Sequence, residues 1–116
     1  MSFKDWKVRI EDILEAVERI RRYTTGMSER QFIADDRTVD AVIRNLEVIG
    51  EAAKRVPPHV TEHHPEIPWA RMNEMRNILV HEYHSVDPAI IFDSARHDLP
   101  PLVGPLRSLL NEKVEA

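Results

Sequence analysis

Apolar residues recur at intervals of three and four along most of this chain, and this interval places them on one face of an α-helix. The first run consists of Trp6, Ile10, Ile13, Leu14, Val17 and Ile20. A second run covers residues 39–53, in a helix that begins at Asp35 or Asp36. With only three glycines in 116 residues, the sequence is unlike a turn-rich all-β protein. We therefore expect an all-α fold.

Capping residues predict where the first helices begin and end. Ser2 and Asp5 resemble a capping box that opens the first helix, which runs to about Tyr23. A second capping box precedes a short helical turn over residues 29–34. The following long helix ends before Pro57-Pro58, because a residue that precedes proline disfavours the helical conformation.

Prolines also divide the second half of the chain. Residues 57–68 hold four prolines and three histidines, and they are expected to form a loop with at most one helical turn. Pro68 suits the first position of a further helix, and Asp87-Pro88 suits the start of the last one. The apolar interval of that last helix continues through Pro100-Pro101, which must kink or divide it because neither proline donates a backbone hydrogen bond.

These elements amount to four or five amphipathic helices with short connections, which favours an antiparallel up-down bundle. A chain of 116 residues is typical of a single domain, so one helical domain is expected over residues 1–116.

The composition excludes several classes of protein. The absence of cysteine excludes disulfides and thiolate metal sites. No apolar run approaches the roughly 20 residues that span a bilayer, and the N-terminus lacks the apolar core of a signal peptide. We therefore expect a cytoplasmic protein without membrane contact.

The charge pattern leaves nucleic-acid binding open. A net charge of −4 argues against such binding by bulk electrostatics. Twelve of the sixteen basic residues are nevertheless arginine, which suits bidentate contact with phosphate. Arg19, Arg21 and Arg22 form one candidate patch, although a solvated helix end is the simpler interpretation.

Histidines in the proline-rich loop superficially resemble a metal-binding cluster. His59, His63 and His64 lie near Glu62. Their spacing matches no standard metal site, and adjacent histidines on a loop rarely ligate the same ion. We expect no metal site and no cofactor.

The most unusual polar residues lie within residues 76–83, Arg-Asn-Ile-Leu-Val-His-Glu-Tyr. On a continuous helix Arg76 and Tyr83 share nearly one face, and so do Asn77 and His81. Arg76 and His81 are five residues apart, so they point about 140° away from each other. They can meet if the helix loosens near His81, or if Arg76 of one subunit faces His81 of another across a two-fold interface.

These residue types suit one kind of chemistry. A histidine can act as general acid or base near neutral pH. An arginine beside it can bind a phosphate and stabilise charge that develops there. Together they suit metal-independent cleavage of RNA, in which the 2′-hydroxyl of the substrate is the nucleophile. Judged by residue type alone, such a pair is more often structural.

The preceding long helix carries two residues that can support this pair. Glu47 and Glu51 are four residues apart and share one face. They can hold Arg76, although two solvated carboxylates are an equal alternative. Gly50 lies between them, and a glycine inside a helix indicates close approach of another helix.

Arg76, His81 and Tyr83 match the Arg-x4-His-x-Tyr motif of the HepT-like branch of the HEPN superfamily. Residues 45–53 are similar to the second characteristic segment of that family. The chain resembles the family along essentially its whole length. The other positions that fit the family pattern are Trp69, Met75 and Asp98-Leu99-Pro100.

The resemblance implies a helical bundle that dimerises, with Arg76 and His81 as the catalytic pair of a ribonuclease in a cleft at the interface. HepT-like proteins are toxins of two-gene modules, paired with a minimal nucleotidyltransferase antitoxin. The antitoxin inactivates the toxin by transferring AMP from ATP to the motif tyrosine, which is Tyr83 here. Asn77 is then expected to orient the RNA phosphate or His81.

A function of another class is also consistent with the sequence. The chain can be a non-catalytic subunit that presents a nucleotide, an RNA or another substrate to a partner nucleotidyltransferase. Residues 76–83 then serve interface recognition, and the net charge of −4 fits this alternative. A plain structural bundle is the third interpretation.

Overall fold

The computed structural model describes residues 5–112, and within this range the chain forms helices and turns but no β-strand. The capping box predicted at Ser2 lies outside the described residues. The α-helices are α1 (Asp5–Thr24), α2 (Glu29–Ile33), α3 (Asp36–Lys54), α4 (Pro58–Thr61), α5 (Trp69–His81), α6 (Pro88–Asp93) and α7 (Val103–Leu110).

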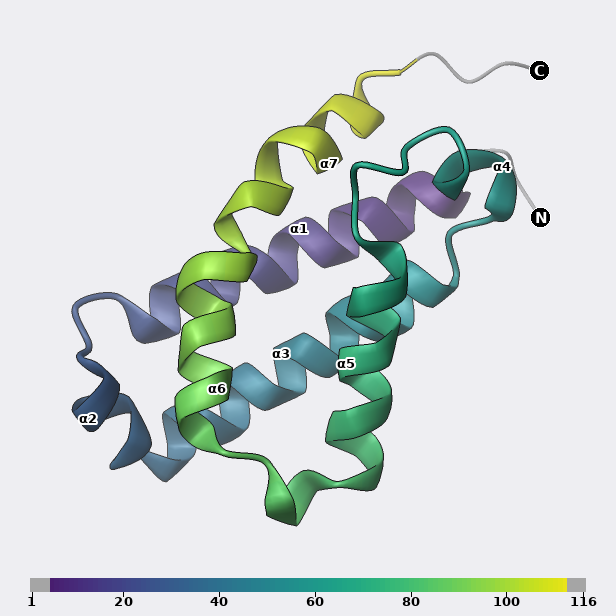
Figure 1. Cartoon of the computed structure of the whole chain (residues 1–116). Coiled ribbons are helices and arrows are strands. Elements are labelled where there is room, and N and C mark those ends of the chain that lie inside the picture. Colours follow the sequence, from purple (N-terminus) through teal and green to yellow (C-terminus); the bar gives the residue numbers. More distant parts are fainter. Residues whose placement is uncertain (1–4, 113–116) are drawn as a thin grey trace.

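The helices pack as a bundle around α3. Helices α1 and α3 lie side by side and run in opposite directions, and α5 packs across α3 (Figure 1). The chain then returns through α6, which contacts α2 and α3, and through α7, which contacts α1. This arrangement confirms the predicted all-α bundle with a bent last helix.

The last helical stretch comprises α6 and α7 and is bent at Pro100-Pro101, as predicted. Between the two helices lies a π-helical turn at Ser94–Asp98, in which the amide of Leu99 donates to the carbonyl of Ser94 over 3.2 Å. A 3-10 turn at Pro100–Leu102 leads into α7. The sequence did not predict the π turn, which widens the helix immediately before the two prolines.

Side-chain caps fix the starts of α2 and α3. Ser28 and Gln31 form the predicted capping box of α2. The Asp35 carboxylate accepts hydrogen bonds from the backbone amide of Thr38 over 3.1 Å and from its hydroxyl over 2.9 Å. These bonds stabilise the charged carboxylate and hold the pKa of Asp35 below its ordinary value.

The proline-rich segment between α3 and α5 contains one short helix, α4, in agreement with the predicted single helical turn. Pro68 caps α5 instead of occupying its first position, so the helix begins at Trp69. The indole of Trp69 donates to the carbonyl of His64 over 3.0 Å, which fixes how the segment enters α5.

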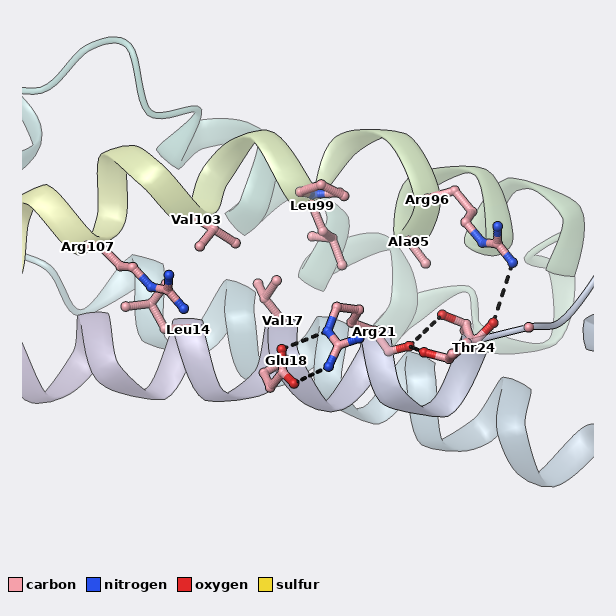
Figure 2. A pocket seen from close by; sticks show the side chains of 13 residues that line it. Leu14, Val17, Glu18, Arg21, Thr24, Ala95, Arg96, Leu99, Val103 and Arg107 are labelled. Carbon is pink, nitrogen blue, oxygen red and sulfur yellow. Dashed lines mark hydrogen bonds and ion pairs between the residues drawn. The ribbon is translucent and has the colours of Figure 1, made fainter.

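Polar side chains line the space between α1 and the last helical stretch (Figure 2). Arg96, in the π turn, donates to the carbonyl of Thr24 over 3.4 Å and to the carbonyl of Met27. On α1, Arg21 donates to both carboxylate oxygens of Glu18, over 2.9 Å and 2.5 Å. The Arg21 hydrogen bonds lower the pKa of Glu18.

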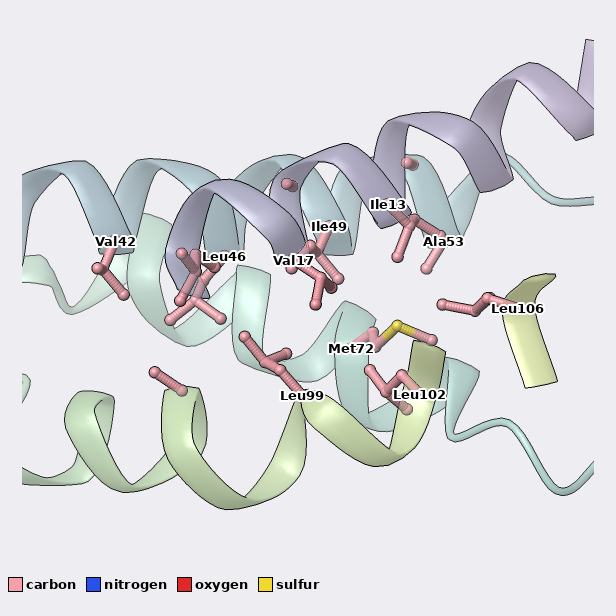
Figure 3. Packing of buried hydrophobic residues seen from close by; sticks show 14 of the residues in the cluster. Ile13, Val17, Val42, Leu46, Ile49, Ala53, Met72, Leu99, Leu102 and Leu106 are labelled. Carbon is pink, nitrogen blue, oxygen red and sulfur yellow. The ribbon is translucent and has the colours of Figure 1, made fainter. Parts of the chain in front are cut away.

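The core lies where the apolar faces of α1, α3, α5 and the last helical stretch meet. Figure 3 shows Leu46 and Ile49 of α3 near Met72 of α5 and near Leu99 and Leu102 of the bent stretch. Burial of one such side chain stabilises the fold by roughly 1.5–3 kcal/mol. These contacts therefore hold α5 and the last stretch in place on α3.

Candidate functional site

Helices α3 and α5 approach each other closely at Gly50. A Cβ atom built on Gly50 would lie 2.2 Å from the Cβ atom of Arg76 and 2.7 Å from the carbonyl oxygen of Met72. Neither distance leaves room for a side chain, so α5 packs this closely only because residue 50 is glycine. The structure thus supports the interpretation of Gly50, and it places the stem of Arg76 directly against α3.

The guanidinium of Arg76 is held by residues of both helices. Its Nε atom lies 3.4 Å from Oε2 of Glu51, and its Nη1 atom donates to Oδ1 of Asn77 over 3.1 Å. Glu51 also pairs with Arg55 over 3.3 Å. The Arg76 side chain is 27% exposed, so solvent and ligands can still reach it.

Glu51 therefore contacts Arg76, and Glu47 does not. Within residues 5–112 Glu47 forms no ion pair with Arg76, although both line one open depression of about 430 Å³. This depression lies between α1, α3 and α5. Its charged lining residues are Arg9, Asp12, Arg44, Glu47, Glu51, Arg55 and Arg76.

Four arginines against three carboxylates give the depression a local positive surplus on a chain of net charge −4. Arg9 pairs with Asp12 over 3.2 Å, whereas Arg44 has no ion pair in the described part of the chain. The sequence did not single out Arg9, Arg44 or Arg55. Arg44, Glu47, Glu51 and Arg55 follow one another at intervals of three and four, and this charged stripe was the available signal.

His81 is the last residue of α5 and is exposed. It does not line the depression that contains Arg76. The helix does not loosen before His81, because the amide of Glu82 still donates to the carbonyl of Ile78 over 2.8 Å. The directions of Arg76 and His81 around the helix axis therefore still differ by about 140°. The structure does not bring the two side chains together within one chain.

Tyr83 lies beyond the end of α5. Glu82 leaves the helical conformation (φ −127°, ψ 31°), and Tyr83 begins a 3-10 turn that ends at Ser85. The prediction that Tyr83 shares a helix face with Arg76 assumed a continuous helix, and it is wrong for this reason. The side chain of Tyr83 is outside the part of the structure that is described.

Two large apolar residues of α5 are exposed. Ile78 is 39% exposed and Val80 is 45% exposed. Ile78 and His81 are three residues apart and share a face of the helix. Val80 lies about 160° from Ile78 around the helix and lines the Arg76 depression.

Two of the loop histidines make polar contacts with other residues. His64 lies 2.8 Å from Glu112 and 3.4 Å from Glu66, and His63 contacts the carbonyl of His59 over 2.6 Å. In the described residues no group of three or more histidine, cysteine or acidic side chains is arranged to hold a metal ion. No helix in that range is both long and apolar enough to cross a membrane.

The sequence matches a known protein family along most of its length. The profile described as "Ribonuclease HepT-like" matches residues 13–109, which include Arg76, His81 and Tyr83. No solved structure gives a significant match.

Curated relatives carry related names. A Thermococcus cleftensis protein named "Probable ribonuclease HepT" is 42% identical over 108 residues, which are 93% of this chain and 96% of the relative. A Methanocaldococcus jannaschii protein named "Putative RNase" is 36% identical over 102 residues, 88% of this chain and 84% of the relative. A second protein of that organism, named "Gamma-glutamylcyclotransferase and putative RNase", is 37% identical over 109 residues, 94% of this chain but 49% of the relative.

Proposed function

Because the chain belongs to the ribonuclease HepT-like family, we propose that it is a metal-independent endoribonuclease with Arg76 and His81 as its catalytic pair. The active form is a homodimer of one-domain chains, residues 1–116. Arg76 of one chain and His81 of the other complete each site. Asn77 positions Arg76 and the RNA phosphate, and Glu51 and Glu47 support the site from α3.

The observation that carries this proposal is the separation of Arg76 and His81 on an intact helix. Arg76 lines a depression with surplus positive charge, whereas His81, at the end of α5, does not line it. A second copy of α5 packed on the face that carries Ile78 and His81 would cover the exposed Ile78. A two-fold contact of this kind presents each His81 to the other chain.

The chemistry follows from these positions. His81 takes the proton from the 2′-hydroxyl, and the 2′-oxygen then attacks the adjacent phosphorus. Arg76 stabilises the extra negative charge on the phosphate oxygens. The imidazolium returns its proton to the 5′-oxygen as the P–O bond breaks. The products are a 2′,3′-cyclic phosphate and a 5′-hydroxyl end.

A substrate without one 2′-hydroxyl tests this mechanism. We expect the purified chain to cleave a single-stranded RNA in the presence of EDTA and to leave cyclic phosphate ends. The same oligonucleotide with 2′-deoxyribose at the cleaved position should remain intact there. Cleavage that requires a divalent metal would contradict the proposal. Tight binding of RNA without cleavage would instead favour a non-catalytic subunit.

Tyr83 is the proposed control point, which makes the chain the toxin of a toxin–antitoxin module. A minimal nucleotidyltransferase partner transfers AMP from ATP to the phenolic oxygen and releases pyrophosphate. Tyr83 follows His81 by two residues. The added phosphodiester is an anion near the RNA phosphate, so it repels and blocks the substrate.

Mass spectrometry tests this modification. After incubation with the nucleotidyltransferase partner and ATP, the parent chain should gain the mass of one or more AMP units and lose ribonuclease activity. Tyr83→Phe should gain no mass. Tyr23→Phe changes the other tyrosine of the chain, which is 41% exposed, and should be modified like the parent. A mass gain that persists in Tyr83→Phe would exclude Tyr83 as the acceptor.

A further inference from the structure

A second cavity shares no lining residue with the Arg76 depression. It has a volume of about 360 Å³, is open to solvent on one side and is bordered by α3, the start of α5 and the bent last stretch. Ligand sites commonly have volumes of roughly 300–1,000 Å³. Its walls are apolar, and Figure 3 shows Leu46, Ile49, Met72, Leu99 and Leu102 directed toward the space between these elements.

One buried polar residue of this cavity has no partner. Ser94 lines the cavity and is 6% exposed, and it opens the π-helical turn. Its hydroxyl makes no hydrogen bond with any other residue in the range 5–112. The Ser94 oxygen is not among the fully buried atoms that lack a partner, so it is accessible and free to bond a ligand in the cavity, and π turns are frequent at functional sites.

The mouth of the cavity carries charges of both signs. Arg71 and Asp98 are exposed, line the cavity and make no ion pair within the described range. Glu66 and His97 also line it, and they contact His64 and Asp93 respectively. A free guanidinium at the rim can bind a phosphate, and a free carboxylate can accept hydrogen bonds from N–H groups.

These features define the chemistry of the occupant. The apolar walls require an apolar body, and Ser94 and Asp98 require hydrogen-bonding groups at its edge. Met72 and Met75 belong to the wall, and methionine sulfur makes favourable contacts with aromatic rings.

We propose that this cavity binds one unpaired nucleobase, with Ser94 and Asp98 bonding the edge of the base and Arg71 bonding the phosphate of the same nucleotide. The proposal rests on the proposed function in one respect, namely that RNA supplies the base. A free mononucleotide presents the same chemistry, and the experiment below separates the two sources.

Methionine NMR gives the most direct test. The chain has four methionines, of which Met72 and Met75 line the cavity and Met27 does not. We use the full chain carrying His81→Ala, so that RNA is not consumed, with ¹³C-labelled methionine methyl groups. A short single-stranded RNA should shift the methyl signals of Met72 and Met75 through the ring current of the base, and should leave Met27 in place.

Matched variants show whether the polar groups act as proposed. Ser94→Ala removes one oxygen and should weaken RNA binding by about 2–10-fold, as expected for one hydrogen bond. Arg71→Gln should weaken it by a similar factor and make binding less sensitive to salt. Ser108→Ala and Arg37→Gln are exposed controls that lie outside the cavity and should bind like the parent. Thermal unfolding of each variant shows whether it is folded.

The outcomes separate the possibilities. Methyl shifts with RNA, lost when the oligonucleotide is abasic, support an RNA base as the occupant. Shifts with a mononucleotide but not with RNA assign the cavity to a free nucleotide. Unchanged methyl signals with both, or unchanged affinity of Ser94→Ala and Arg71→Gln, would overturn the proposal. If the parent binds RNA in this way but never cleaves it, the base site stands and the ribonuclease proposal fails.

Discussion

Replacing His81 with alanine is expected to lower the rate of RNA cleavage by about 10²–10⁴-fold, the usual contribution of a general acid or base. The midpoint of thermal unfolding should not change, because His81 is exposed and its side chain makes no hydrogen bond or ion pair with other described residues. The rate is measured with a single-stranded RNA in EDTA, and unfolding is followed by circular dichroism. His59→Ala is the matched control, since His59 is another exposed histidine of the chain.

Retention of the parental rate in His81→Ala would remove the histidine from the mechanism. A loss of the same size in His59→Ala would indicate a general effect of histidine substitution instead. Arg76→Gln should also lose most activity while keeping the methylene stem that packs against Gly50. Its stability should change by less than about 1 kcal/mol, because the Arg76–Glu51 pair is partly exposed.

Gly50→Ala should destabilise the protein although it introduces a better helix former. The new methyl group would overlap the Cβ atom of Arg76 and approach the Met72 carbonyl at 2.7 Å. The Cβ atom and the carbonyl oxygen are both fixed to the backbone of α5, so the whole helix must move away from α3. Overpacking of this kind costs about 1–3 kcal/mol, and the gain of roughly 1 kcal/mol in helix propensity offsets only part of this cost. Because Arg76 moves with α5, activity should fall as well.

Gly104→Ala is the control for this substitution. Gly104 lies in α7, and a Cβ atom there meets nothing within 4 Å. The same change should therefore be neutral or stabilise by up to about 1 kcal/mol. The free energy of unfolding in urea gives both values. A Gly50→Ala protein as stable as Gly104→Ala would show that α3 and α5 are not in tight contact.

The fold was predictable because its signals are local. Apolar intervals define the helices, and Pro100-Pro101 defines the bend of the last stretch through missing hydrogen-bond donors. The π turn at Ser94–Asp98 was not predictable in this way. Its backbone pattern depends on how the bent stretch packs against α1 and α3, and no residue in it has a conformational restriction that requires a π turn.

The sequence predicted the contacts of the candidate site better than it predicted where α5 ends. Gly50 lies where another helix approaches closely, as a glycine inside a helix indicated, and Glu51 contacts Arg76, which was one of two equal alternatives. The end of α5 at His81 was missed, because neither glycine nor proline follows it to signal a stop. Because Tyr83 follows the end of α5, its position could not be predicted either. Ser94 was missed because a single serine in an apolar run has no distinctive pattern.

Mixed dimers test the central claim that two chains complete each site. One chain carries Arg76→Ala and the other carries His81→Ala. The two chains are co-expressed with different tags, and the mixed dimers are purified through both tags. Each mixed dimer then holds one site with both substitutions and one intact site, so about half of the parental activity per dimer is expected. Activity no higher than that of either single variant would place Arg76 and His81 in the same chain and contradict the account.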